Sequence, residues 1–184
     1  MRIQFVESAP AYDGLQLSTG FFDEQLEGGG DGLLLFVSEA DVPAHHMVDL
    51  EDADAGDGIY SPLMAHVLVE HRDRDLREGV LLQRMLVRLA AEWVEGRAGQ
   101  SLRVQGDDVY VNDGKLSVSV ATRSPRGVLM HLGVNVDIEG TPVAAAGLRD
   151  LRVPPEEFLR GVARAYVAEI DSVEHAVSKV RATT

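Results

Sequence analysis

The chain of 184 residues contains no cysteine. This absence excludes a disulfide framework, a thiolate ligand for a metal ion and a cysteine nucleophile, and it favours a reducing compartment. Lysine is almost as scarce, because Lys115 and Lys179 are the only two and arginine supplies the other basic residues. A lysine that falls inside a regular pattern is therefore an informative residue in this chain.

Positive charge is also in short supply. The chain has 30 acidic and 17 basic residues, a formal net charge of -13, and such a surface repels nucleic-acid phosphates. Long apolar runs are missing too: no stretch approaches the roughly 18 residues that cross a bilayer, and residues 1–8 lack the pattern of a signal peptide. We expect a cytoplasmic protein without a nucleic-acid or membrane partner.

The composition, 45% hydrophobic and 26% charged, suits a single compact domain over residues 1–184. In the first half, the glycine run over 28–32 is predicted to be a loop. Three short strands are predicted around it, over residues 3–6, 33–37 and 47–50. Apolar residues then recur at helical spacing over 61–71 and 79–95, which predicts two helices.

Between residues 102 and 137 the pattern changes to strict alternation of apolar and polar residues, which is typical of strands with one buried face. A turn at Asn112-Asp113-Gly114 predicts a hairpin, and a further strand is predicted over 130–137. Three neighbouring strands are then expected to share one apolar and one polar face. The polar face is expected to carry Lys115, Ser117, Ser119, His131, Gly133 and Asn135.

The C-terminal segment begins with Pro154-Pro155-Glu156-Glu157, which is typical of a helix start. Apolar residues then recur every three or four positions and form a stripe able to cover the apolar face of the sheet. The stripe consists of Phe158, Val162, Tyr166, Ile170, Val173, Val177 and Val180. These patterns together predict an α+β fold, in which helices pack against a mainly antiparallel sheet.

The polar face is a candidate ligand-binding surface, because its short side chains leave room for a ligand to approach the backbone. A plain solvent face is the alternative. The residues predicted to bind substrate or nucleotide are Ser117, Ser119, Gly133, Asn135 and Asn112. Lys115 is predicted to neutralise a carboxylate or phosphate there, although its place beside a turn fits a surface lysine equally well.

An acidic cluster over residues 49–57 supplies candidate metal ligands. Asp49, Glu51 and Asp52 are predicted to hold Mg²⁺, which prefers oxygen ligands and keeps several waters. A solvated acidic loop is the alternative. Together with His66, these carboxylates define a lower-ranked hypothesis, a metal-dependent hydrolase.

Two histidines are candidate functional residues for different reasons. His131 is predicted to act as a general base toward an amine, because an unperturbed histidine has a pKa of about 6.5. A structural histidine is the alternative. His66 and Glu70 would lie on one face of the predicted helix, but a lone pair of this kind is more often structural, so zinc is not predicted.

Six short stretches of the chain, together with the closing Lys179-Val180-Arg181, resemble an uncharacterised prokaryotic family known as domain-of-unknown-function family 366. The stretches are Tyr12-Asp13-Gly14, Met47-Val48-Asp49-Leu50-Glu51-Asp52, Gln83-Arg84, Gly106-Asp107-Asp108-Val109-Tyr110, Lys115-Leu116-Ser117-Val118-Ser119-Val120-Ala121 and Gly140-Thr141-Pro142-Val143. The resemblance spans nearly the whole chain and implies no activity.

A second resemblance is to the central segment of biotin and lipoate protein ligases. It rests on residues 107–116 and on Leu132-Gly133-Val134-Asn135-Val136. In those enzymes a hairpin lysine contacts the carboxylate of the acid substrate and the activated phosphate, so the resemblance implies that Lys115 holds a carboxylate or acyl phosphate. It further implies that Asp107 or Asp108 positions Mg²⁺ or an amine. By the same resemblance, Asn135 lines the nucleotide end.

The resemblance also implies a fold and a chemistry. The fold is the core shared by biotin and lipoate ligases and class II aminoacyl-tRNA synthetases, and the cofactors are ATP and Mg²⁺, although the arginine- and glycine-rich nucleotide loops of both ligases have no counterpart here. We expect an acyl-activating or acyl-transferring enzyme that acts on a small carboxylic acid or its acyl adenylate. A non-enzymatic small-molecule binder, or a degenerate ligase-fold subunit, is the second hypothesis. A homodimer is considered as its oligomeric state.

Overall fold

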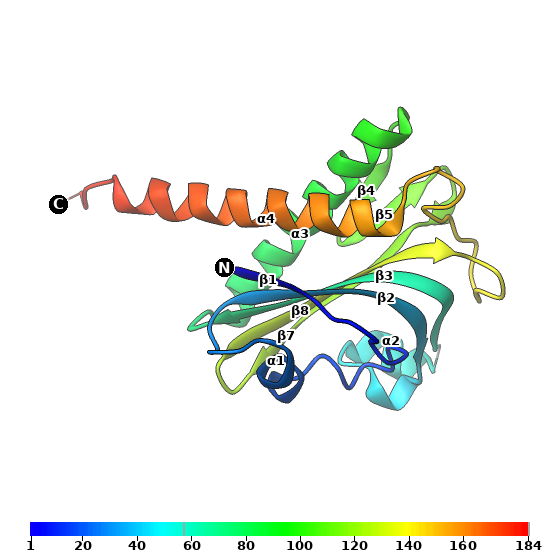
Figure 1. Ribbon diagram of the computed structural model, residues 1–184, viewed down its shortest axis with the longest axis horizontal. Coiled ribbons are helices and arrows are strands. Elements are labelled where there is room, and N and C mark those ends of the chain that lie inside the picture. Colours follow the sequence, from blue (N-terminus) through cyan, green and yellow to red (C-terminus); the bar gives the residue numbers. More distant parts are fainter. Residues whose placement is uncertain (57, 184) are drawn as a thin grey trace.

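The computed structural model describes residues 1–56 and 58–183 as an α+β protein, with helices on both faces of a mainly antiparallel sheet (Figure 1). The strands of the main sheet follow the order β1-β2-β3-β8-β7. β1 runs parallel to β2, and the other neighbours are antiparallel. These strands are β1 (Arg2–Phe5), β2 (Gly32–Val42), β3 (Ile59–Arg72), β7 (Ser117–Ser124) and β8 (Gly127–Asp137). The predicted fold class is confirmed.

The helices form two layers. α3 (Leu76–Ala98) and α4 (Pro155–Ser178) lie on one face of the sheet, and they include the helix predicted over 79–95. α1 (Thr19–Gln25), a 3-10 helix (Ala44–His46) and α2 (Leu50–Ala55) lie toward the other side (Figure 1). The sheet therefore separates two cores.

Each face of the sheet buries its own set of side chains, because successive residues of a strand point in opposite directions. Leu35 and Val67 pack with Phe158 on the side of α4, whereas Leu34 packs with Phe22 of α1. Burying one such side chain stabilises the fold by about 1.5–3 kcal/mol. Since both faces are covered, the central strands are apolar at consecutive positions.

The helix predicted over 61–71 is wrong, because these residues belong to β3. β3 lies between β2 and β8, and both of its faces are buried. A strand of this kind has no apolar–polar alternation, so its pattern does not distinguish it from a buried helix. His66 and Glu70 consequently share one face of a strand.

The strand predicted over 47–50 is also wrong. The chain there passes from the 3-10 helix to α2, and Asp49 is the N-cap of α2. The Asp49 carboxylate accepts hydrogen bonds from the backbone N–H groups of Glu51, at 2.9 Å, and Asp52, at 3.2 Å. A carboxylate at this position satisfies N–H groups that have no partner inside the helix.

The turn at residues 112–114 is confirmed, but its strands divide between two sheets. β5 (Asp108–Val111) pairs with β6 (Gly114–Lys115) and with β4 (Arg103–Gln105) in a separate small sheet. The chain then enters the main sheet as β7, which pairs with β8. The expectation that all three strands share one sheet is therefore wrong for β5.

The C-terminal helix begins at Pro155, as predicted, and buries Phe158, Val162 and Tyr166. Its predicted apolar stripe covers the sheet only over this first part. Val173 and Val177 are 40% and 65% exposed because α4 extends beyond the edge of the sheet (Figure 1). Within residues 1–56 and 58–183, no helix combines the length and apolarity that a membrane crossing needs.

A buried hydrogen bond ties α4 to the sheet. The Tyr166 hydroxyl lies 2.8 Å from Nε2 of His71, and Nδ1 of His71 lies 3.1 Å from the Asp31 carboxylate. We expect Tyr166→Phe to lower the free energy of unfolding by about 1 kcal/mol, because the substitution removes one buried bond and leaves the ring in place. Urea titration measures this change.

The control for this prediction is Tyr60→Phe. Among the described residues, no hydrogen-bonding group contacts the Tyr60 hydroxyl. This variant is expected to have the urea midpoint of the natural sequence. Equal midpoints for Tyr166→Phe and Tyr60→Phe would contradict the role of the bond to His71.

Candidate functional site

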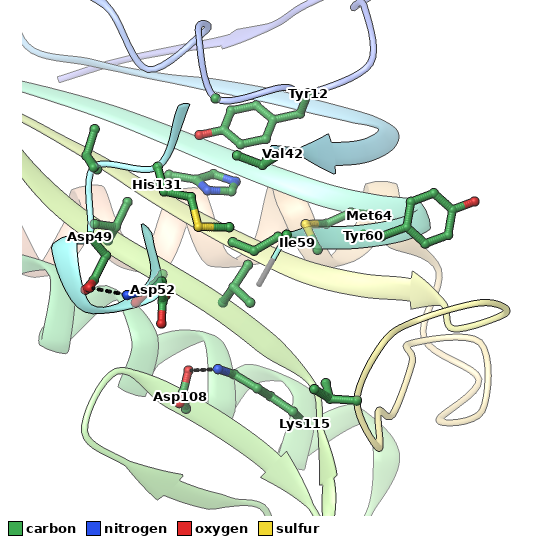
Figure 2. A pocket seen from close by; sticks show the side chains of 18 of the residues that line it. Tyr12, Val42, Asp49, Asp52, Ile59, Tyr60, Met64, Asp108, Lys115 and His131 are labelled. Atoms are coloured by element: carbon green, nitrogen blue, oxygen red, sulfur yellow. Dashed lines mark hydrogen bonds and ion pairs between the residues drawn. The ribbon is translucent and has the colours of Figure 1, made fainter. Parts of the chain in front are cut away.

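A cavity of about 500 Å³ lies on the face of the sheet opposite α3 and α4. β3, β7 and β8 contribute its floor, and segments distant in sequence contribute its walls (Figure 2). The walls come from the N-terminal segment, α2, the β5–β6 hairpin and the loop over residues 141–145. The cavity therefore lies on the side of β8 that carries His131 and Asn135.

Lys115 supplies an ammonium group to the wall of this cavity. Its Nζ lies 3.0 Å from Oδ1 of Asp108, and the Lys115 side chain is 31% exposed. The Tyr110 hydroxyl donates to the other oxygen of Asp108, at 3.2 Å. This ion pair is drawn in Figure 2. The ammonium is thus partly buried and oriented before any ligand binds.

The backbone of Lys115 is held by its neighbours. Its carbonyl accepts hydrogen bonds from the Ala146 N–H, at 3.0 Å, and from the Asn135 side-chain amide, at 3.1 Å. Gly114 allows the loop to approach so closely, since a Cβ there would lie 2.8 Å from the Ala145 carbonyl oxygen. Asn135 also lines the cavity, and its amide fixes the strand that presents Lys115.

Asp107 and Asp108 have different partners, although both line the cavity. The Asp107 carboxylate accepts a hydrogen bond from Gln83 of α3, at 3.0 Å, and lies 3.4 Å from the Arg84 guanidinium. Asp108 pairs with Lys115. The ligase resemblance left the two aspartates as alternatives, and the structure places Asp108 beside the lysine.

The acidic residues of α2 form part of the cavity rim. Asp49, Glu51 and Asp52 all line the cavity, with Asp49 also capping the helix. Burial and the charge of Asp49 raise the pKa of Asp52, and Lys115 opposes this shift. Asp52 is therefore close enough to interact with both charges.

The predicted metal site is not assembled. In the part of the chain that the structure describes, no group of three His, Asp or Glu side chains converges to hold a metal ion. The Asp49 carboxylate is already engaged by two backbone N–H groups. Asp57, the last acidic residue of the predicted cluster, lies outside the described residues.

The two serines predicted on the polar face point the other way. Ser117 pairs with Val134 and Ser119 with Leu132, so both serines face α3 and α4. The Ser117 hydroxyl accepts a hydrogen bond from the Val109 N–H, at 3.0 Å. The Ser119 hydroxyl accepts from the Gln83 amide, at 2.8 Å. Ser119 touches the cavity, but Ser117 does not.

Val118 and Val120 take the place of these serines on the cavity face of β7. The predicted polar surface of β7 is therefore wrong. The physical reason is that polar partners on the helix side satisfy both hydroxyls: Ser117 is buried there beside the Val109 N–H, and Ser119 turns toward Gln83 of α3.

Gly133 and Asn112 do not line the cavity. A Cβ on Gly133 would collide with the Met64 sulfur and would lie 3.1 Å from the His131 ring. The glycine therefore makes room for protein side chains rather than for a ligand. Asn112 is exposed in the β5–β6 turn, with φ of 52°. Gly133 and Asn112 were predicted to leave room for a ligand beside the backbone, and neither does so.

His131 lies at the floor of the cavity in a stack of rings. It is 5% exposed, its Nε2 lies 3.1 Å from Nδ1 of His66, and its ring centroid lies 4.2 Å from that of Tyr12. Burial, and then His66, lower the pKa of His131 well below 6.5. Burial also lowers the pKa of His66 to about 3. His131 is therefore a weaker base than the unperturbed histidine assumed from the sequence.

The family of this chain follows from comparison with known proteins. The model of a family described as "Domain of unknown function (DUF366)" matches residues 1–181. The chain belongs to the DUF366 family. A solved protein of unknown function from Pyrococcus horikoshi is 32% identical, with all of both chains covered and a TM-score of 0.93.

Two more distant solved structures show which fold the DUF366 chain has. A biotin protein ligase mutant from Aquifex aeolicus, solved with biotin, is 14% identical; the match covers 93% of this chain and 70% of the ligase, with a TM-score of 0.62. A lipoate-protein ligase A solved with ATP is also 14% identical; 92% and 85% of the chains are covered, with a TM-score of 0.59. The predicted biotin and lipoate ligase-like fold is confirmed.

Tyr12 is the residue of the DUF366 site that pattern analysis missed. Backbone hydrogen bonds to Glu39, at 2.8 Å, and Asp41, at 2.9 Å, fix its segment to β2. Its ring is 4% exposed and lies over the cavity beside His131 (Figure 2). No periodicity marks this position. The available signal was the family resemblance, which includes Tyr12-Asp13-Gly14.

Proposed function

We propose that this protein is an acyl-activating or acyl-transferring enzyme that acts on a small carboxylic acid. The observation that carries the proposal is the position of Lys115, a partly buried ammonium on the wall of a cavity of about 500 Å³. That volume suits a small molecule. The ligase-like fold gives further support, since a ligase of this fold was solved with biotin, a small carboxylic acid.

Lys115 is proposed to stabilise negative charge at the acyl group. An ammonium interacts more strongly with a carboxylate or oxyanion in a cavity than in bulk water. Asp108 orients the ammonium, and Asn135 holds the strand that presents it. Apolar side chains on other walls, including Ile59 and Met64, are available to pack against a hydrocarbon chain.

ATP and Mg²⁺ are the cofactors that the ligase fold implies, but the cavity does not suit a nucleoside triphosphate. Among the described residues that line it, five are carboxylates, Lys115 is the one side chain that is always cationic, and none is arginine. The polyanionic phosphates would be repelled by most of this wall. Transfer of an already activated acyl group fits these charges better than activation by ATP.

The proposed transfer uses an amine as acceptor. Its nitrogen attacks the carbonyl carbon of an acyl adenylate, and the charge that develops on the carbonyl oxygen lies beside Lys115. The bond from that carbon to the phosphate oxygen then breaks, AMP leaves, and the amine loses one proton to solvent. His131 contributes as a neutral hydrogen-bonding group at the floor, because its burial makes it a weak base.

The test is amide formation from hexanoyl adenylate and a primary amine. We expect a protein-dependent rate of AMP release that saturates with the adenylate. Acid-dependent exchange of pyrophosphate into ATP, measured in parallel, would identify activation instead of transfer. If neither reaction occurs and calorimetry detects no binding of hexanoate, the proposed function is wrong.

The second candidate function is non-enzymatic binding of a small molecule by a ligase fold. The charge of the cavity wall favours it, since Lys115 already has Asp108 as a partner. Binding of hexanoate without either reaction would identify this function. The metal-dependent hydrolase loses its support, because Asp49 caps α2 and His66 contacts His131 rather than the acidic rim.

A further inference from the structure

The surroundings of Lys115 are more negative than a simple acid requires. Asp108 lies 3.0 Å from the ammonium, and Asp52 faces it from the rim (Figure 2). Arg84 contacts Asp107 and two backbone N–H groups contact Asp49. Among the described residues, Lys115 is the one lysine or arginine that lines the cavity with the remaining carboxylates. A carboxylate bound to Lys115 would therefore also approach Asp108 and Asp52, and like charges at short range repel each other.

The charge of Asp52 is only partly compensated in the free protein. Burial and Asp49 raise its pKa, Lys115 acts in the opposite direction, and Asp108 adds to the increase. A cation placed between Asp52 and Asp108 would relieve this repulsion. No group of three His, Asp or Glu side chains converges among the described residues, and an ammonium group needs only the two carboxylates that are present.

Tyr12 adds a polar group to the same cavity, across it from Lys115 (Figure 2). The residue is 4% exposed, and its ring lines the cavity with the hydroxyl directed along the His131 side (Figure 2). Within residues 1–56 and 58–183, no group makes a hydrogen bond to this hydroxyl. The hydroxyl is therefore a polar group of the cavity wall that is available to a ligand.

We propose that the ligand of this site is an amine-bearing acid with an apolar chain, whose ammonium binds Asp52 and Asp108 and whose carboxylate binds Lys115. This inference rests on the proposed function and names its substrate class. Ile59 and Met64 contact the chain. Both charges of the ligand are then matched, which the bare acid does not achieve.

Three small probes that differ only in their charged groups test the proposal. Norleucine carries both an amine and a carboxylate, hexanoate lacks the amine, and pentylamine lacks the carboxylate. Isothermal titration calorimetry measures each dissociation constant at pH 7. We expect norleucine to bind at least about tenfold more tightly than either of the others, the value of roughly one well-placed charged contact.

Asp52→Asn is expected to change the affinities of norleucine and hexanoate in opposite directions. We expect norleucine to bind about tenfold more weakly to this variant, because one partner of its ammonium is lost. Hexanoate should bind more tightly, because one repulsive charge is removed. Asp54→Asn is the matched control: it removes a carboxylate from the same helix that does not line the cavity, and it should change neither constant.

The outcomes separate this inference from the function on which it rests. Equal affinities for norleucine and hexanoate would overturn the amine site and leave acyl chemistry intact. If adding Mg²⁺ makes hexanoate bind as tightly as norleucine, the cation between Asp52 and Asp108 is a metal ion. That result would also overturn the inference. Pentylamine as the tightest probe would contradict the carboxylate site at Lys115, and with it the proposed function.

Discussion

Lys115→Ala is expected to lower kcat/KM for amide formation from hexanoyl adenylate by a factor of about 10² to 10³. A positioned charge or donor that stabilises a developing oxyanion typically contributes about 3–4 kcal/mol to lowering the barrier. Lys115 meets the structural conditions for such a role, since Asp108 orients it and the cavity shields it partly from water. The rate of AMP release measures the effect.

Lys179→Ala is the matched control for this prediction. Lys179 is the other lysine of the chain and lies exposed at the end of α4. The Lys179→Ala substitution removes the same charge from the protein and is expected to leave kcat/KM unchanged. A rate for Lys115→Ala within twofold of the natural sequence, with the protein folded, would exclude the proposed role of the ammonium.

Stability is expected to fall as the pH is lowered from 7 to 5, and His66 alone should account for about 2 kcal/mol of this fall. Burial lowers the pKa of His66 to about 3, whereas histidine in the unfolded chain has a pKa of about 6.5. Below that value the unfolded state takes up a proton that the folded state does not bind. About 1.5 pH units at 1.36 kcal/mol each give the stated loss.

His66→Phe tests this prediction, because phenylalanine keeps a ring between Phe36 and His131 but binds no proton. Urea titration gives the free energy of unfolding at pH 7 and at pH 5. The difference between these two values should be about 2 kcal/mol smaller in the variant than in the natural sequence. His175→Asn, a change on the exposed part of α4, should keep the full difference. An unchanged difference in His66→Phe would contradict a buried neutral His66.

Several features of the fold could be predicted because they depend on local pattern. α3 has an apolar stripe at helical spacing, and α4 begins at a proline followed by two glutamates. The strict alternation in β8 identified a strand, and Asn112-Asp113-Gly114 identified the turn before Lys115. Each of these signals lies within a few residues of the structure that it predicts.

β3 and β7 could not be predicted correctly because their environment depends on distant segments. β3 is covered by helices on one side and by the N-terminal segment on the other, so its apolar run gave no strand period. In β7 the serines face the helical core because Gln83 and the Val109 N–H satisfy them. Neither partner is visible from the sequence of β7 itself.

In the candidate site, too, local features could be predicted and contacts between distant segments could not. The sequence identified Lys115 and the aspartates before it, but the choice of Asp108 as the partner depends on Gln83 and Arg84 holding Asp107. Asp49, predicted to bind metal, caps a helix that the pattern did not reveal. The low pKa of His131 is a consequence of burial beside His66, a neighbour that is 65 positions away in the chain.

The most direct test of the site at Lys115 is a crystal structure of the protein soaked with 6-bromohexanoate, whose bromine can be located by anomalous scattering. We expect the carboxylate within hydrogen-bonding distance of the Lys115 ammonium and the bromine among the apolar walls near Ile59 and Met64. A bromine signal outside the cavity, or a carboxylate bound away from Lys115, would contradict the account.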